Sequence, residues 1–180
     1  MEFYLTIGQL QAENLNSFLR DNNYLLDHQS YSFNDISGFL KGFIDLVFEH
    51  DGKYYIADYK SNYLGPTPEH YDIAHCKTAM YEHHYHLQYL IYTLALHRYL
   101  KLRIPDYDYD RHFGGVYYLF LRGMYADDDQ QKGIYFHRPD AAVLQELNTW
   151  ARISSANSAR AIRPRRRERS PLPPPHMAMP

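Results

Sequence analysis

The sequence predicts a single α/β domain built on a mixed β-sheet, and three observations support this fold class. Two strand candidates rich in aromatic and β-branched residues, Phe39 to Phe48 and Lys53 to Lys60, flank the hairpin signal Asp51-Gly52. A long helical pattern follows over residues 73–102. The apolar stretch "GGVYYLFLRG" then indicates a buried strand over residues 114–123. Strands followed by helices, with one dominant hairpin, favour a mixed sheet.

The other segments are assigned from local signals. The stretch "IGQLQAENLNSFLRDNN" predicts partly helical structure within residues 1–30, and residues 62–72, with two prolines, predict a loop. Pro105 closes the long helix, in which apolar residues recur at helical spacing: Leu87, Leu90, Ile91 and Leu94. "IYFHR" predicts a short strand, and Asp140 is suited to cap a last helix that runs through Trp150.

The composition permits one folded domain and predicts no membrane contact. The chain has 180 residues, of which 45% are hydrophobic and 16% aromatic, so a sizeable core can form. No apolar run approaches the roughly 18–20 residues that span a bilayer, and "MEFYLTIGQLQAENL" lacks the features of a signal peptide. The lone Cys76 excludes an internal disulfide and fits a reducing compartment. We therefore expect a cytoplasmic protein.

Charge divides the chain into an acidic body and a basic end. Residues 1–150 carry 12 lysines and arginines against 20 aspartates and glutamates, a net −8, and residues 151–180 carry 7 against 1, a net +6. An acidic body attracts nucleic acid poorly. Metal ions, a local basic patch or a partner protein would therefore have to bring nucleic acid to this domain. Because the basic end is also proline-rich, we expect a domain over residues 1–150 and a disordered tail over 151–180.

Two aspartates and a lysine interrupt the apolar strands of the hairpin. A two-residue turn at Asp51-Gly52 places Asp45 directly opposite Asp58, with Cβ atoms about 4.5–5.5 Å apart. Lys60 lies two residues beyond Asp58 and projects from the same face, about 6–7 Å further along. Like charges opposed in this way destabilise a sheet unless a cation lies between them.

A divalent metal ion is the cation that best explains this arrangement. Two carboxylates, retained waters and a substrate phosphate describe a Mg²⁺ site, which Mn²⁺ or Ca²⁺ could also occupy. Metal and lysine together would lower the pKa of a bound water and stabilise the charge that builds on a phosphate. The alternative is that Asp45 and Asp58 simply pair with Lys60, Lys41 or a remote arginine.

An acidic residue in one strand, a hairpin and D-x-K in the next strand resemble the core motif of the PD-(D/E)xK nuclease superfamily. More closely, "LKGFIDLVFEHDGKYYIADYKSNYLG", "HLQYLIYTLALHRYL" and "FGGVYYLFLRG" are similar, in the same order, to the C-terminal nuclease domain of the RecB family, the nuclease of RecBCD (exodeoxyribonuclease V). The resemblance covers roughly residues 35–150. It implies a restriction-endonuclease-like fold, a mixed sheet flanked by helices, and Mg²⁺-dependent hydrolysis of DNA phosphodiesters in double-strand break repair and recombination.

The resemblance also implies roles for individual residues of the hairpin. Asp45 and Asp58 correspond to the metal-binding carboxylates, and Lys60 to the catalytic lysine that orients or activates the attacking water. The main-chain carbonyl of Tyr59 corresponds to a further metal ligand.

The family's Q-x-x-x-Y element matches Gln88 and Tyr92, which are one helical turn apart and hence share a face beside Tyr81 and Tyr85. Gln88 could form a hydrogen bond to DNA or to the residues of the candidate site, and Tyr92 could support Gln88. An ordinary half-buried helix face is the alternative explanation for this pair.

Partners follow from the same resemblance. We expect DNA, single-stranded or with duplex ends, RecC- and RecD-like subunits, and an ATP-driven helicase part in the same polypeptide. The chain contains no G-x-x-x-x-G-K-[ST] motif, so it has no ATP site of that kind itself.

One metal ligand of the family cannot be assigned to a residue of this sequence by its motif. The family places a further metal-binding histidine on a helix well upstream of the hairpin, so we expect a domain that is N-terminally truncated and incomplete in that ligand. The histidine-rich stretch "YEHHYHLQ" offers only the pair His83 and His86 at ligand spacing, which is more typical of a solvated or partly packed helix face than of a zinc site.

Two other classes of function remain open at this point. A catalytically incomplete nuclease-like fold could act as a DNA- or protein-docking module. The same carboxylates could also serve a Mg²⁺-dependent phosphatase that acts on small phosphate esters.

Overall fold

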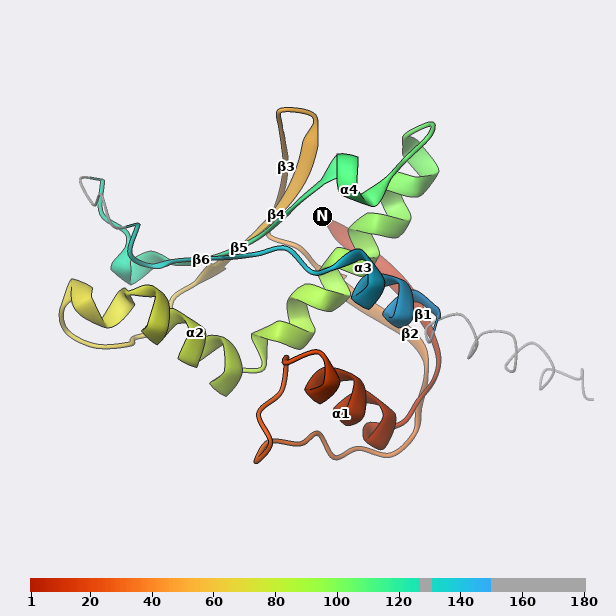
Figure 1. Ribbon diagram of the computed structural model, residues 1–180, viewed down its shortest axis with the longest axis horizontal. Coiled ribbons are helices and arrows are strands. Elements are labelled where there is room, and N and C mark those ends of the chain that lie inside the picture. The colour runs from red at the N-terminus through yellow and green to blue at the C-terminus, as the bar shows by residue number, and fades with distance from the viewer. Residues whose placement is uncertain (127–130, 150–180) are drawn as a thin grey trace, which may run out of the picture.

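The chain forms two β-sheets and a set of helices in the computed structural model, which describes residues 1–126 and 131–149 (Figure 1). A two-stranded ribbon pairs β1 (Glu2–Leu10) with β2 (Ile36–Phe43). A four-stranded sheet has the order β3 (Leu46–His50), β4 (Lys53–Lys60), β5 (Phe113–Phe120) and β6 (Ile134–His137). The helices are α1 (Ala12–Asp21), α2 (Ile73–Glu82), α3 (Tyr85–Arg103) and α4 (Tyr109–His112), with 3₁₀ turns at Pro68–Tyr71 and Leu121–Gly123 and a helical segment over residues 141–149.

Strands β3 and β4 form the predicted hairpin, which projects from the body in Figure 1. Its pairs run from His50 with Lys53 to Leu46 with Ala57, the register expected from the turn. Asp51 and Gly52 have φ values of +49° and +73°, the left-handed geometry of a tight hairpin turn. Because β4 pairs parallel to β5, and β5 antiparallel to β6, the sheet is mixed and the predicted fold class is confirmed.

The four-stranded sheet has two unlike faces. The covered face contacts α2 and α3, and its side chains are buried: Ile56, Val116, Tyr118, Phe120 and Tyr135. The opposite face, here called the open face, carries Leu46, Phe48, Tyr55, Tyr59, Tyr117 and Phe136. Aromatic rings contact one another across this face, yet Leu46, Tyr59 and Phe136 remain exposed. The described residues thus leave an apolar sheet surface in solvent.

The single strand predicted from Phe39 to Phe48 is divided into two strands, because its two halves pair with different strands. β2 pairs with β1, and β3 pairs with β4. Between them, the Ile44 amide donates to the Met1 carbonyl at 2.8 Å, which completes the ribbon. At Asp45 the chain bends and enters the second sheet. Asp45 therefore lies just outside the regular ladder and not in the middle of a strand.

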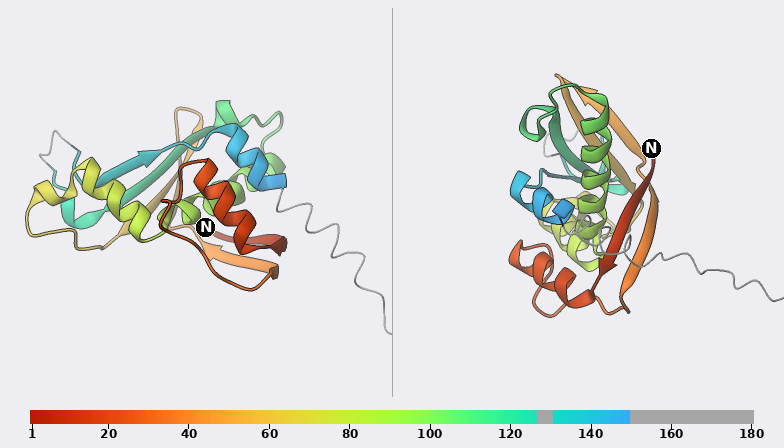
Figure 2. Two further views of the ribbon diagram at one scale, coloured as in Figure 1. Left: turned by 60° about the horizontal axis from the view of Figure 1, so that its bottom comes forward. Right: turned by 90° about the vertical axis from the view of Figure 1, so that its right-hand side faces the viewer.

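The helix predicted over residues 73–102 is likewise divided. α2 ends at Glu82 and α3 starts at Tyr85, with His84 in the left-handed region at φ +56°. Apolar periodicity continues across this corner, which is why the sequence pattern indicated one helix. The right-hand view of Figure 2 shows α3 between the β1–β2 ribbon and the group formed by α1 and the 141–149 helix.

The N-terminal segment is more extended than predicted. The expected helix is present as α1, but residues 7–10 belong to β1. Phe3 and Leu5 are buried while Tyr4 and Thr6 are exposed, the two-residue period of a half-buried strand. Phe3 packs edge-on against Tyr92 of α3, with ring centroids 5.6 Å apart.

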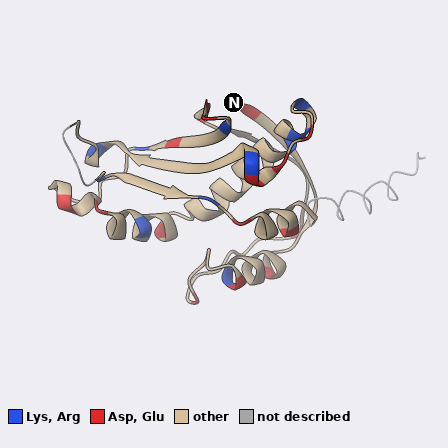
Figure 3. Ribbon diagram, turned by 45° about the horizontal axis from the view of Figure 1, so that its top comes forward, with Lys and Arg blue, Asp and Glu red and all other residues tan. Residues whose placement is uncertain are grey.

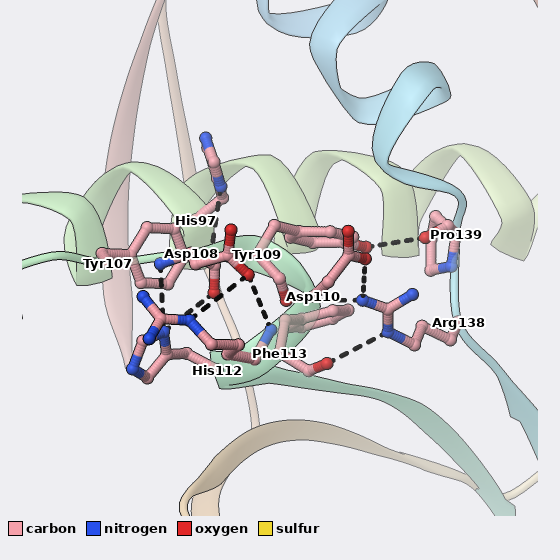
Figure 4. A network of polar contacts seen from close by, with 10 residues as sticks. His97, Tyr107, Asp108, Tyr109, Asp110, His112, Phe113, Arg138 and Pro139 are labelled. Atoms are coloured by element: carbon pink, nitrogen blue, oxygen red, sulfur yellow. Dashed lines mark hydrogen bonds and ion pairs between the residues drawn. The ribbon is translucent and has the colours of Figure 1, made fainter.

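A polar network fastens the start of β5 to the segment after β6 (Figure 4). Arg138 forms an ion pair with Asp110 at 2.7 Å and donates to the Phe113 carbonyl at 3.1 Å. The Tyr109 hydroxyl donates to the Pro139 carbonyl at 2.8 Å. These contacts join β5 and β6 at the end opposite Lys60, so they stabilise the sheet without touching Asp58 or Lys60.

Gly115 is a position where the sheet tolerates no side chain. Its φ is +144°, and a Cβ would lie 2.5 Å from the Phe136 ring and 3.1 Å from the His137 carbonyl oxygen. We expect Gly115→Ala to lower the free energy of unfolding by about 1–3 kcal/mol, because it combines backbone strain with a clash across β6. Urea denaturation would measure this, and an unchanged midpoint would contradict it.

Other sequence expectations fall at or beyond the limits of the described residues. Among residues 1–126 and 131–149, no helix has both the length and the apolar character to cross a membrane. The expected end of the last helix at Trp150 and the tail over 151–180 lie outside the described residues, so the division at residue 150 stays a prediction.

Candidate active site

Strand β4 directs Asp58 and Lys60 toward α3. Alternate residues of a strand point to the same face, so both side chains lie on the covered face with Ile56. Asp58 is 3% exposed and Lys60 9%, although both are ionisable. β5 flanks them in the ladder, where Asp58 pairs with Tyr118.

A buried ion pair joins the two side chains. The Lys60 Nζ lies 2.6 Å from Asp58 Oδ2. Burial raises the pKa of Asp58, the hydrogen bond and charge of Lys60 lower it in part, and the Asp45 carboxylate raises it again. Lys60 thus offsets only part of the cost of burying the negative charge of Asp58. Binding of a further cation beside this carboxylate would therefore be favourable.

Gln88 connects the ion pair to α3. Its Oε1 accepts hydrogen bonds from the Lys60 Nζ and the Tyr118 hydroxyl, each at 2.9 Å. Its Nε2 donates to the Tyr92 hydroxyl at 2.9 Å. The Q-x-x-x-Y pair therefore lies directly at the D-x-K strand, and the two motifs form one network.

Aromatic rings enclose the lysine head group. The Lys60 Nζ lies 3.8 Å from the ring centroid of Tyr85 and 4.9 Å from that of Tyr118, within the range of cation–π attraction. The Tyr85 hydroxyl donates to Asn62 Oδ1 at 3.1 Å, which holds its ring beside the end of β4. Tyr81, also expected beside this face, instead donates to the Asn23 carbonyl.

Asp45 approaches the pair from the bend between β2 and β3. Its Oδ2 accepts a hydrogen bond from the Tyr59 amide at 3.0 Å. This contact replaces the ladder pairing expected opposite Asp58, because regular pairing stops at Leu46 with Ala57. Asp45 is exposed, whereas Asp58 is buried, and the Asp45 carboxylate lies near enough for its charge to raise the pKa of Asp58.

The residues present fit a hard divalent cation with open coordination positions. Among residues 1–126 and 131–149, no three or more His, Cys, Asp or Glu side chains are grouped to hold a metal. Mg²⁺ needs only one or two carboxylates, since waters and substrate phosphate fill its remaining positions. A buried carboxylate whose pKa is raised by burial, with a second carboxylate near it, provides such a donor set.

Charged residues of both signs are spread over the described part of the chain. Figure 3 shows acidic and basic residues interspersed over the helices and loops of the described chain. Lys60 is largely buried by its partners and offers little field to solvent. The folded part therefore has no broad electrostatic attraction for a polyanion, as its composition indicates.

The chain belongs to the PD-(D/E)XK nuclease superfamily. The sequence profile of that family matches residues 10–171, which include the hairpin, the D-x-K strand and the helix with Gln88 and Tyr92.

The individual relatives carry the name RecBCD enzyme subunit RecB. The chain is 51% identical over 146 residues to the protein of Escherichia coli, 48% over 149 residues to that of Haemophilus influenzae, and 46% over 119 residues to that of Mycobacterium tuberculosis. These matches cover 80%, 82% and 63% of this chain but 12%, 12% and 11% of the relatives. The predicted resemblance to RecB is confirmed, and the chain spans about an eighth of the length of these relatives.

Sequence reasoning did not identify Tyr118 as part of the site. It lies in "GGVYYLFLRG", where several apolar and aromatic residues suit a buried strand equally well, so only the parallel register with Asp58 brings it to the network. His86 was expected on a solvated or partly packed helix face but is 3% exposed, because its ring packs against Tyr81.

Proposed function

We propose that this chain is the nuclease part of an ATP-dependent helicase–nuclease and hydrolyses DNA phosphodiester bonds with Mg²⁺ bound at Asp45 and Asp58. The observation that carries the proposal is the buried Asp58–Lys60 pair, with Asp45 beside it, in a chain of a nuclease superfamily. The RecB name of the relatives supports an exodeoxyribonuclease V-type role in double-strand break repair and recombination.

The carboxylates and one main-chain oxygen are the proposed cation ligands. The contacts that hold Asp45 and Asp58 both use Oδ2, so we assign Oδ1 of each to the cation, together with the Tyr59 carbonyl. Bound there, Mg²⁺ would supply positive charge that lowers the pKa of a water and stabilises the phosphate in the transition state. Mn²⁺ or Ca²⁺ could occupy the same ligands.

Lys60 and the tyrosine network are proposed to position the reacting groups. The Lys60 ammonium has three N–H donors, of which two are directed to Asp58 Oδ2 and Gln88 Oε1. We assign the third to the attacking water or to a phosphate oxygen. Because the Tyr92 oxygen accepts from Gln88, its own O–H remains as a donor to DNA.

A partner that delivers DNA is consistent with this acidic domain. Because residues 1–150 carry a net charge of −8, binding of free DNA should be weak. We propose that a helicase part of the same polypeptide, with RecC- and RecD-like subunits, brings unwound single strands or duplex ends to Lys60.

The proposal is tested by cleavage of single-stranded DNA with Mg²⁺ and with chelator. We expect wild-type cleavage that needs the metal and that falls by roughly 10³-fold or more in Asp45→Ala and Asp58→Ala, because each removes a carboxylate needed to hold the cation. Glu49→Ala, which removes an exposed carboxylate of the same hairpin, is the matched control and should cleave like the wild type. Full activity in Asp58→Ala would refute the proposal.

A docking module is the second candidate, and two observations favour it. Only two carboxylates meet at the site among the described residues, and the open face of the sheet presents apolar side chains to solvent. Wild-type protein as inactive as Asp58→Ala, with Mg²⁺ and with Mn²⁺, would support this candidate. Hydrolysis of small phosphate esters without cleavage of DNA would instead indicate a phosphatase.

A further inference from the structure

Tyr118 lies beside the Asp58–Lys60 ion pair and belongs to neither the D-x-K motif nor the Q-x-x-x-Y motif. It is fully buried on β5, next to Asp58 in the parallel ladder. Its hydroxyl donates to Gln88 Oε1 at 2.9 Å and, less closely, to the Tyr85 carbonyl at 3.4 Å. Its ring centroid is 4.9 Å from the Lys60 Nζ. Tyr118 thus contacts the lysine by its ring and the lysine's amide partner by its hydroxyl.

The donors around Gln88 allow one orientation of its amide. The Tyr118 hydroxyl lies 2.9 Å from Gln88 Oε1 and donates to it, because an amide oxygen only accepts hydrogen bonds. An ammonium group such as that of Lys60 has only donors. The donors of Lys60 and Tyr118 lie on the same side of the Gln88 amide and hold its Oε1 on that side. The Nε2 of Gln88 then points toward the Tyr92 hydroxyl and donates to it. The hydrogen bonds therefore run in one direction, from Tyr118 through Gln88 to Tyr92.

A phenylalanine would fill the same space in the core, so the hydroxyl needs its own explanation. A buried hydroxyl destabilises a core unless it forms a hydrogen bond. Here its closest partner is the side chain of Gln88, which also binds Lys60, and not the backbone of its own sheet. The hydroxyl is thus joined to the candidate active site and not only to the fold.

We propose that Tyr118 is a positioning residue: its hydroxyl fixes the Gln88 amide, and through that amide it fixes the ammonium of Lys60 and the hydroxyl of Tyr92. This inference rests on the proposed function. It acts through Gln88 and requires no contact between Tyr118 and DNA.

Tyr118→Phe tests the proposal because it removes the hydroxyl and keeps the ring. We expect kcat on single-stranded DNA to fall about fivefold to tenfold with a smaller change in KM, since Lys60 and Tyr92 lose their fixed positions while both groups remain present. Gln88→Ala should be impaired at least as much, and the double variant should be no slower than Gln88→Ala alone. Tyr109→Phe is the matched control, because its hydroxyl is also buried and bonded, to the Pro139 carbonyl in the remote network of Figure 4. It should lose stability but keep kcat.

A second readout does not depend on cleavage. The ring faces of Tyr85 and Tyr118 should shift the Lys60 ε-methylene proton resonances upfield, and Tyr118→Phe should move them toward the usual lysine position as the head group loses its fixed amide partner. Unmoved resonances, or losses of kcat that add in the double variant, would overturn the proposal. If wild-type protein cleaves nothing, the proposed function fails, and the Lys60 resonances alone decide whether Tyr118 positions the lysine.

Discussion

Replacing Asp58 with asparagine is expected to abolish both metal-dependent DNA cleavage and the stabilisation of the fold by divalent metal. Burial raises the pKa of Asp58 above its ordinary value of 3.8 in spite of Lys60. A group whose pKa is raised on folding contributes stability below its unfolded pKa and loses it as pH rises through the folded pKa. At neutral pH the charged carboxylate therefore lowers the stability of the metal-free protein, and a bound cation offsets that cost. Asparagine removes the charge that the cation would neutralise, and it also leaves the buried Lys60 ammonium without its anionic partner.

Thermal unfolding with and without divalent cation measures the stabilisation by metal, and the assay on single-stranded DNA described above measures cleavage. Mg²⁺ or Mn²⁺ should raise the Tm of the wild type, because it binds the folded state, and should leave the Tm of Asp58→Asn unchanged. Asp72→Asn is the control: the backbone hydrogen bond from His75 lowers the pKa of Asp72, so that substitution should not stabilise and should retain the shift with metal. A rise in the Tm of Asp58→Asn on addition of metal would contradict the prediction.

Short-range signals determined the parts of the local geometry that the sequence predicted correctly. The Asp51-Gly52 turn sets the register of β3 and β4, and the two-residue period of β4 then places Asp58 and Lys60 on one face. The i, i+4 spacing of Gln88 and Tyr92 is equally local, and the structure joins them by a hydrogen bond. These features depend only on neighbouring residues, so a single sequence contains them.

Features that depend on distant partners were missed. The bend at Asp45 arises because β2 pairs with β1 while β3 pairs with β4, and no local residue pattern records that exchange. The corner at His84 falls within an apolar pattern that suits a continuous helix. Tyr118 reaches Gln88 only through the parallel pairing of β4 and β5, which are separated in the chain by α2, α3 and α4.

Acid is expected to destabilise the fold through a buried histidine on α3. His86 is 3% exposed, and its ring lies 4.3 Å from that of Tyr81 and 5.6 Å from that of Tyr89. Its Nδ1 is buried without a hydrogen-bond partner among the described residues. Burial, with smaller effects of His137 and Lys77, lowers the pKa of His86 to about 4. The folded protein thus resists protonation of a ring that the unfolded chain protonates readily.

The sign and the pH window follow from that shift. Above the ordinary histidine pKa of 6.5 the ring is neutral in both states, so its full contribution to stability is present. As pH falls from about 6.5 to about 4, only the unfolded chain takes up the proton, and stability is lost by about 3 kcal/mol in total. Burial also lowers the pKa of His137, so it acts in the same direction, whereas the raised pKa of Asp58 acts in the opposite one.

The difference between two variants isolates the contribution of His86. Urea denaturation of His86→Leu and wild type across this pH range cancels the terms from His137 and Asp58, which both proteins share. We expect the free energy of unfolding of the variant, relative to wild type, to rise steadily as pH falls, because leucine has no proton to take up. His83→Leu alters an exposed ring at the same corner and should retain the wild-type acid transition. Parallel pH curves for His86→Leu and wild type would show that the buried ring does not govern acid stability, and the loss would then have to come from His137 or the carboxylates.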